Sequence, residues 1–202
     1  MNTNKEQIIK AVDLLRQGRL VVFPTDTVYG LGADATCEAA ILSVFALKKR
    51  SLGCPLIVHI PNIKHLSEWV DPEYLKRDEL FVLAEKFWPG PLTIVVKKAA
   101  KVSNVMTSGQ NTIAIRIPNH PIALELLKNF NSGIVGTSAN LSDHNSPTTF
   151  EQVFNVFGDQ VFMLDGGPCN FGIESTIVSL VEKPVILRQG VISLEELQGC
   201  LG

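Results

Sequence analysis

The sequence is poor in features that mark several large protein classes. Four cysteines occur in 202 residues, and none of them forms a C-x-x-C pair or lies at metal-ligand spacing from a histidine. A disulfide framework and a structural zinc site are therefore not expected. No apolar run approaches the roughly 20 residues that a membrane span needs, and the amino-terminal segment lacks the apolar core of a secretion signal. We expect a cytoplasmic protein that makes no membrane contact.

An excess of charge of one sign is also missing. Lys and Arg number 18, and Asp and Glu number 20, which gives a formal net charge of −2. Binding to nucleic acid through net charge alone is not expected, so any anion site must be a local cluster of cations. Hydrophobic residues make up 46% of the chain, which is enough for a sizeable core. We find no repeat and no linker, and we predict a single domain over residues 1–202.

Segments with strand and helix patterns alternate along the chain. The expected strands are 20–23, 56–60, 92–96, 112–117, 134–137, 161–164, 176–180 and 185–187. The expected helices are 6–17, 36–49 (capped by Thr36), 63–69, 72–87, 121–130, 150–157 and a short one from Ser193. This alternation favours an α/β fold with a helix-covered sheet that is at least partly parallel. Because the last two strands resemble an antiparallel hairpin, we predict a mixed sheet.

Polar side chains follow several of the expected strands directly. They are the segment 24–30, His59, Arg116 and the segment 138–140. Each has an ordinary alternative explanation, since threonines form turns and Ser138 or Asn140 can cap a helix. Ligands of α/β proteins bind beyond the carboxyl ends of strands. Taken together, these clusters predict one crevice at that edge of the sheet.

Glycines 30 and 32 belong to a stretch, GLGADA, that matches the dinucleotide-binding pattern G-x-G-x-x-A. In a true fingerprint the glycines follow the strand at once, and an acid about 20 residues later binds the ribose. Here six residues intervene, and the next strand ends in a histidine without an acid. We therefore do not expect a nicotinamide or flavin cofactor. No G-x-x-x-x-G-K-[ST] loop is present either, so any ATP site must be built differently.

Cations are concentrated at the end of the second expected helix, where Lys48, Lys49 and Arg50 are consecutive, and at Arg188. Cations are favoured at a helix carboxyl terminus for electrostatic reasons alone. The alternative is a phosphate clamp, in which Lys supplies a compact charge and Arg a planar fork. A chain without net positive charge needs such a cluster to bind a triphosphate.

Several separated motifs occur in the order that is found in one family. They are Pro24–Gly32, Lys48–Arg50, Pro55–His59, Phe87–Thr93, Arg116–Pro118 with His120–Pro121, Thr137–Asn140 with Ser146–Thr148, Glu174–Val178 and Leu187–Gly190. On these motifs, which extend over nearly the whole chain, the sequence resembles the YrdC family, the L-threonylcarbamoyl-AMP synthases of tRNA threonylcarbamoyladenosine modification. Cys54 departs from the Asn or Ser that commonly precedes Pro55 in that family.

The resemblance implies a twisted mixed α/β fold, in the short single-domain form, around a concave cavity that holds ATP and L-threonine. It implies threonine-binding positions at Thr27, His59, Arg116 and Ser175. It implies ATP-binding positions at Lys48, Arg50, Thr112, Ser138, Asn140, Ser146 and Arg188, of which Lys48 and Arg50 are expected to be catalytic. We expect Mg²⁺ to bind together with ATP, and we expect no metal site that is formed by protein side chains alone.

The reaction that the resemblance implies joins L-threonine, bicarbonate or carbon dioxide, and ATP into threonylcarbamoyl-AMP and pyrophosphate. Within it, Arg116 is expected to pair with the threonine carboxylate, and His59 either accepts a proton from the amine or only orients the substrate. The expected partner is the transferase complex that delivers the group to tRNA. Two other functions remain open: a non-catalytic module that binds double-stranded RNA or tRNA, and an ATP-binding paralogue without synthase activity.

Overall fold

The computed structural model describes residues 3–201, and residues 1, 2 and 202 of the predicted domain lie outside the described residues. The strands are β1 (Val21–Phe23), β2 (Gly30–Asp34), β3 (Ile57–His59), β4 (Leu92–Lys97), β5 (Thr112–Arg116), β6 (Ile134–Ser138), β7 (Phe162–Met163), β8 (Thr176–Ser179) and β9 (Val185–Arg188). The helices are α1 (Thr3–Arg16), α2 (Glu38–Lys48), α3 (Leu66–Trp69), α4 (Asp78–Phe87), α5 (Pro121–Phe130), α6 (Phe150–Phe157) and α7 (Leu194–Leu201), with short 3₁₀ turns at Ile63–His65, Tyr74–Lys76 and Gly158–Gln160.

The strands form one nine-stranded sheet in the order β7-β1-β2-β6-β3-β5-β4-β8-β9. Three neighbouring pairs are parallel, namely β1 with β7, β3 with β5, and β4 with β8. The other neighbours are antiparallel, and they include the predicted hairpin of β8 and β9. The predicted α/β class and the mixed sheet are therefore confirmed.

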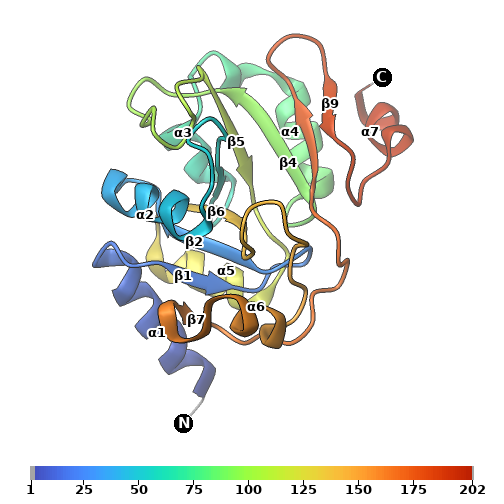
Figure 1. Ribbon diagram of the computed structural model, residues 1–202. Coiled ribbons are helices and arrows are strands. Elements are labelled where there is room, and N and C mark those ends of the chain that lie inside the picture. Colours follow the sequence, from blue (N-terminus) through green and yellow to red (C-terminus); the bar gives the residue numbers. More distant parts are fainter. Residues whose placement is uncertain (1–2, 202) are drawn as a thin grey trace.

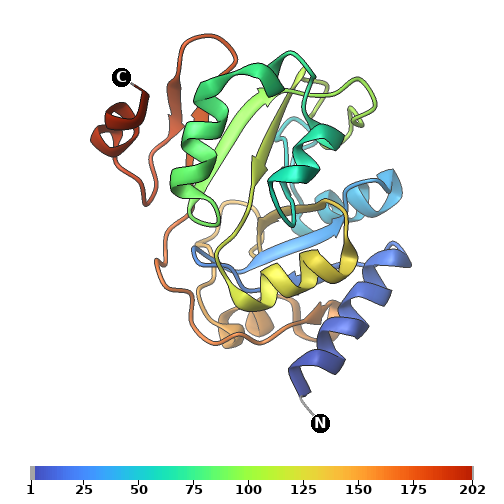
Figure 2. The same ribbon diagram turned by 180° about the vertical axis from the view of Figure 1, so that it is seen from behind.

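Helices cover the sheet around two apolar clusters. The larger cluster contains buried side chains of α2 and α4 together with those of β3, β4 and β5. The smaller one joins α1 and α5 to β1 and to the start of β6. Figure 2 shows α5 in yellow and α1 in dark blue side by side over the blue strands β1 and β2, while Figure 1 shows the opposite side, where β9 lies next to α7 and the carboxyl terminus. No helix within residues 3–201 has both the length and the apolar character that a membrane crossing requires.

Helices α5 and α6 have the bounds that the sequence predicts, because both of their ends carry strong local signals. Helix α5 begins with a proline directly after His120, whose Nδ1 accepts a hydrogen bond from the Ile122 amide at 3.2 Å. It ends at Asn131, which adopts the left-handed conformation with φ 56°. Helix α6 begins with a capping box formed by Thr149 and Gln152.

Several of the expected helices differ from the prediction, and the one expected over 63–69 is a 3₁₀ turn followed by the four-residue α3. The second helix begins at Glu38 and not after Thr36, because the Thr36 hydroxyl donates to Asp34 Oδ1 at 2.7 Å and caps nothing. The helical stretch expected over 72–87 is divided into a 3₁₀ turn and α4, with Arg77 in an extended conformation between them.

Strand β2 is the element that the sequence analysis missed, since the stretch GLGADA was examined there only as a cofactor motif. It is a central strand, and Gly32 is paired in register with Val21 on one side and with Gly136 on the other. A Cβ at Gly32 would lie 2.7 Å from Phe23 Cε1, 2.7 Å from Ile134 Cγ2 and 2.9 Å from the Val135 carbonyl oxygen. The glycine is therefore required by close packing on the sheet.

We predict that Gly32→Ala lowers the free energy of unfolding by about 2 kcal/mol, because the added methyl group overpacks a rigid sheet. Chemical denaturation measures the loss. The control is Gly199→Ala in α7, where a Cβ meets nothing within 4 Å. Equal stability of the two variants would show that the space at Gly32 is not needed.

Candidate active site

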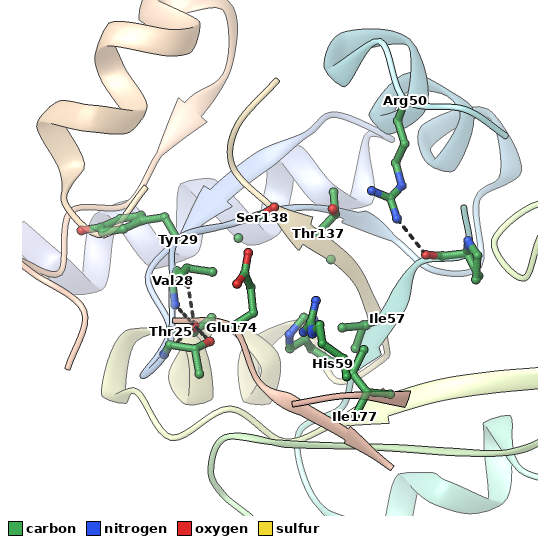
Figure 3. A pocket seen from close by; sticks show the side chains of 15 residues that line it. Thr25, Val28, Tyr29, Arg50, Ile57, His59, Thr137, Ser138, Glu174 and Ile177 are labelled. Atoms are coloured by element: carbon green, nitrogen blue, oxygen red, sulfur yellow. Dashed lines mark hydrogen bonds between the residues drawn. The ribbon is translucent and has the colours of Figure 1, made fainter. Parts of the chain in front are cut away.

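A cavity of about 170 Å³ lies against one face of the sheet. It is lined by Thr25, Thr27, Val28, Tyr29, Gly30, Arg50, Pro55, Ile57, His59, Gly136, Thr137, Ser138, Glu174, Ile177 and Arg188. Figure 3 shows the side chains that surround it. Five of the predicted site residues are therefore brought together: Thr27, Arg50, His59, Ser138 and Arg188.

The predicted position of the crevice, beyond the carboxyl ends of the strands, is wrong. Strands β3 and β6 are antiparallel neighbours, with Ile57 opposite Gly136 and His59 opposite Ile134. The carboxyl ends of β3 and β6 therefore point in opposite directions. Alternate residues of these strands share one face, and Ile57, His59, Gly136 and Ser138 form a continuous part of the cavity wall.

Arg116 is buried directly behind the lining residue Thr27. Its Nη2 lies 2.6 Å from Asp26 Oδ1, its Nη1 donates to Thr27 Oγ1 at 2.8 Å, and its Nε donates to the Gly90 carbonyl oxygen at 2.9 Å. Burial lowers the pKa of Arg116, and the carboxylate of Asp26 opposes that shift. The geometry does not match the expectation that Arg116 presents a free fork to the threonine carboxylate, because each guanidinium nitrogen already donates to a protein oxygen and Arg116 lies behind the lining residues.

The loop that carries Thr27 is held by the hydroxyl of Thr25. Thr25 Oγ1 donates to the Val28 carbonyl oxygen at 2.6 Å and accepts from the amides of Thr27 and Val28, both at 3.2 Å. A hydroxyl that satisfies several backbone groups stabilises a tight turn. The threonines of this segment are therefore turn formers as well as lining residues, so the two interpretations offered by the sequence both hold here.

His59 is 5% exposed and lies in the middle of the cavity wall. Its ring packs edge-on against Phe23, with 5.6 Å between ring centroids, and it occupies space left by Gly136, where a Cβ would lie 2.5 Å from Cε1. Burial, together with the nearby positive charge of Arg116, lowers the pKa of His59 to about 3. At neutral pH the imidazole is therefore uncharged and a weak base, which favours an orienting role over proton removal.

Lys48 is also buried, at 1% exposure, and its ammonium group faces the loop after β6. Nζ donates to the Ser138 carbonyl oxygen, to the Asn140 carbonyl oxygen at 2.5 Å and to Asn140 Oδ1 at 2.9 Å. Burial and then the neighbouring Arg50 lower the pKa of Lys48 to about 8. An ammonium group has three donors, and all three are used, so Lys48 holds the 138–140 loop in place.

Asn140 completes this network from within the same loop. Its Oδ1 accepts from the Ser138 hydroxyl at 2.6 Å as well as from Lys48, and its Nδ2 donates to the His144 carbonyl oxygen. Ser138 itself lines the cavity. Lys48 and Asn140 thus support Ser138 from behind.

The guanidinium groups of Arg50 and Arg188 face the cavity from two distant parts of the chain. Arg50 is half-buried and donates to the carbonyl oxygens of Cys54 and Pro55, each at 3.2 Å. Arg188 donates to the Ser175 carbonyl oxygen at 2.9 Å through Nη2 and to the Ser175 hydroxyl at 3.2 Å. Burial lowers the pKa of Arg188, Glu174 opposes this and Arg50 adds to it. These two cations provide the positive charge of the lining.

The remaining predicted residues lie beside or beneath the cavity. Ser175 is 1% exposed, under Arg188, and its hydroxyl is 2.8 Å from that of Thr93. Thr112 lines an adjoining hollow that shares Pro55, Ile57 and Ile177 with the cavity. The Ser146 hydroxyl donates to Glu174 Oε1 at 2.5 Å.

Glu174 is the lining residue of greatest chemical interest that the sequence reasoning did not select. Figure 3 shows its carboxylate pointing into the cavity. The hydrogen bond from Ser146 lowers the pKa of Glu174. The sequence signal that could have identified Glu174 is its position directly before Ser175, at the start of the motif Glu174–Val178.

Comparison with known proteins shows the family to which the chain belongs. The family model Sua5_yciO_yrdC, described as telomere recombination, matches residues 13–190. The chain belongs to this family. The threonylcarbamoyl-AMP synthase of Pyrococcus abyssi is 42% identical over 194 residues, covering 95% of this chain and 56% of the relative. The synthase of Vibrio vulnificus is 31% identical over 190 residues, covering 94% of this chain and 100% of the relative.

Solved structures of the family have the same fold. The crystal structure of P. abyssi Sua5 complexed with L-threonine matches with a TM-score of 0.93 and 40% identity, covering 98% of this chain and 58% of that one. Escherichia coli YciO matches with a TM-score of 0.82 at 23% identity, covering 96% of this chain and 93% of that one, and shows the fold alone. The resemblance to the YrdC family is thus confirmed. This chain spans 56% and 58% of the first two curated relatives that it matches, from P. abyssi and Bacillus subtilis.

We predict that Arg116→Met lowers the free energy of unfolding by about 3–5 kcal/mol, because Asp26 is left as an unpaired buried carboxylate. Chemical denaturation measures the loss. The double variant Asp26→Leu with Arg116→Met should recover part of it, since both charges are then absent. A loss below about 1 kcal/mol for Arg116→Met would contradict the role given to the pair.

Proposed function

We propose that this chain is a threonylcarbamoyl-AMP synthase, which condenses L-threonine, bicarbonate or carbon dioxide, and ATP into threonylcarbamoyl-AMP and pyrophosphate. The observation that carries the proposal is a cavity in which two arginines and several hydroxyl groups converge in a chain of this family. The names of the relatives at 42% and 40% identity point the same way. We further propose that residues 1–202 act as one domain.

Arg50 and Arg188 bind the phosphates of ATP in this proposal. Both reach the lining, and both are fixed by hydrogen bonds to backbone carbonyl oxygens, so their charges are already in place when the ligand arrives. Guanidinium groups match phosphate oxygens geometrically. Ser138 adds a hydroxyl from the loop that Lys48 and Asn140 hold. Lys48 is accordingly a positioning residue, and Ser146 acts through Glu174.

L-Threonine binds beside His59 and Thr27 in this proposal. Arg116 donates to the Thr27 hydroxyl, and Thr27 Oγ1 lies 3.0 Å from Thr25 Oγ1, so the Thr27 side chain is fixed in the wall beside the substrate. The neutral imidazole of His59 offers one further hydrogen-bonding group. Ser175 supports the site through Arg188. The adjoining hollow, which Thr112 lines, provides room for the nucleoside part of ATP.

Mg²⁺ enters as part of the ATP substrate. Within residues 3–201 no group of three His, Cys, Asp or Glu side chains could hold a metal ion alone. Mg²⁺ usually keeps several waters and binds substrate phosphates, so the triphosphate of ATP supplies the protein-independent part of its ligands. When bound, the ion neutralises charge on the phosphate oxygens.

The chemistry consists of two bond-forming steps. The ammonium group of threonine releases a proton to solvent, the neutral amine attacks carbon dioxide, and the carbamate forms with release of a second proton to solvent. A carbamate oxygen then attacks the α-phosphorus, and the bond from this phosphorus to the bridging oxygen of pyrophosphate breaks. Positioning and charge neutralisation account for most of the acceleration in phosphoryl chemistry, and the fixed arginines supply both.

The transferase complex that passes the group to tRNA remains the proposed partner, and the cytoplasm the proposed location. The two alternative functions, RNA binding and ATP binding without synthesis, both predict that no product forms in the following assay, and separate titrations with ATP and with RNA distinguish them. Purified protein is incubated with ATP, bicarbonate and each amino acid in turn, and pyrophosphate and the adenylate are measured. Product with threonine supports the proposal, and ATP binding without product under every condition contradicts it.

We predict that Arg50→Ala reduces threonine-dependent pyrophosphate release by about 100-fold, because a fixed charge opposite the phosphates is lost. The thermal unfolding midpoint should stay close to that of the wild type, since Arg50 is half-buried and bonds only neighbouring carbonyl oxygens. The exposed Arg19→Ala serves as the matched control. Unchanged turnover of Arg50→Ala would remove this residue from the phosphate site.

A further inference from the structure

Glu174 supplies the negative charge of a cavity that otherwise offers positive and neutral groups. Among the described lining residues the ionisable side chains are Tyr29, Arg50, His59, Glu174 and Arg188. Burial raises the pKa of Tyr29 to about 12 and lowers that of His59 to about 3, so both are uncharged at neutral pH. One carboxylate and two guanidinium groups therefore carry the charge that a ligand meets.

The Glu174 carboxylate is oriented by a hydrogen bond, and both this bond and the positive charge of Arg188, which lies beyond ion-pair distance, lower the pKa of Glu174. Ser146 donates to its Oε1 at 2.5 Å and fixes the direction of the group. Across residues 3–201, the ion pairs found within 4.0 Å involve other carboxylates and leave Glu174 without a cationic partner. Figure 3 shows the carboxylate pointing into the open space and away from the chain that carries it. An ionised group held in this way is available to a cation that enters the cavity.

The substrate assigned to this cavity brings such a cation. A free amino acid is a zwitterion, and its carboxylate and ammonium group lie on the same carbon. Arg50 and Arg188 attract the carboxylate of the amino acid and the phosphates of ATP, but they repel the ammonium group of the amino acid. The neutral imidazole of His59 cannot compensate the positive charge of that ammonium group. Within the described lining, the carboxylate of Glu174 is the group that complements an ammonium ion.

We propose that Glu174 recognises the α-ammonium group of the amino-acid substrate and so selects amino acids over carboxylic acids that lack an amine. The inference rests on the proposed function and names a specificity determinant of that same cavity. Ser146 is then a positioning residue, which aims the carboxylate. The contact belongs to the ground state, because the amine must lose its proton before it attacks carbon dioxide.

This ground-state character determines how a variant should behave. Glu174→Gln keeps the size of the side chain and an oxygen that can accept from Ser146, but it removes the charge. Pairing stabilises the ammonium form and not the reactive neutral amine, so the charge lowers KM and kcat together and leaves kcat/KM unchanged. Glu174→Gln should raise KM for L-threonine at least tenfold and raise kcat in proportion, so that kcat/KM stays within about threefold of the wild type.

The test compares two ligands by calorimetry with wild-type protein and variants. The ligands are L-threonine and the 2,3-dihydroxybutanoate of matching configuration, in which a hydroxyl replaces the ammonium group. Wild-type protein should prefer threonine, and Glu174→Gln should lose at least tenfold in affinity for threonine while its affinity for the hydroxy acid is unchanged. Glu174→Asp should fall between the two, and the exposed Glu182→Gln, which alters net charge equally, should behave as the wild type.

Three results would overturn the proposal: equal weakening of both ligands, threonine affinity within twofold of the wild type, or a change confined to the Mg²⁺ dependence of ATP binding. The last result would assign Glu174 to the metal. If wild-type protein neither binds threonine nor releases pyrophosphate with it, the proposed function fails and the recognition of the ammonium group fails with it. Normal wild-type synthesis with unaltered threonine binding by Glu174→Gln removes only the inference about Glu174.

Discussion

The buried ion pair between Arg116 and Asp26 is the constraint on which the rest of the site depends. Arg116 ends β5 in the middle of the sheet, Asp26 belongs to the loop after β1, and the two side chains are 4% and 2% exposed. A buried charge that loses its partner is strongly destabilising. Because the same guanidinium binds Thr27 and the Gly90 carbonyl oxygen, one group fixes the loop against the sheet. The cavity wall is therefore set by folding, before any ligand arrives.

The cations of the sequence motifs divide into two groups by burial. Every side-chain nitrogen of Lys48 and Arg116 donates to protein oxygens, and the two residues hold loops. Arg50 and Arg188 bond mainly to backbone carbonyl oxygens and face the cavity. Lysine and arginine thus serve both to hold the loops and to bind the ligand. The hydrogen-bond acceptors of each side chain show which of the two roles it has. Glu174 adds one oriented negative charge to this surface, which gives the cavity the charge pattern of a zwitterion beside a polyphosphate.

Local signals in the sequence predict much of the fold, as α5 and α6 show with their cap residues. Strand β2 escapes prediction because Gly30 and Gly32 have low strand propensity, and their place in the sheet is decided by Phe23 and Ile134, which approach too closely for a side chain. The motifs contain residues that the fold brings to one cavity, since Thr27, Arg50, His59, Ser138 and Arg188 all line it. They do not reveal that Asp26 engages Arg116 or that the 138–140 loop engages Lys48. Those roles depend on contacts between residues that are 90 or more positions apart.

The central claim is that one pre-formed cavity holds an amino acid and a nucleotide between Arg50, Arg188 and Glu174. A crystal structure of the protein with L-threonine and a non-hydrolysable ATP analogue tests it most directly. We expect phosphate oxygens within hydrogen-bonding distance of both guanidinium groups, the ammonium group of threonine beside the Glu174 carboxylate, and the Arg116–Asp26 pair unchanged. A triphosphate bound on another face of the sheet, or an Arg116 that leaves Asp26 to bind the threonine carboxylate, would contradict the account.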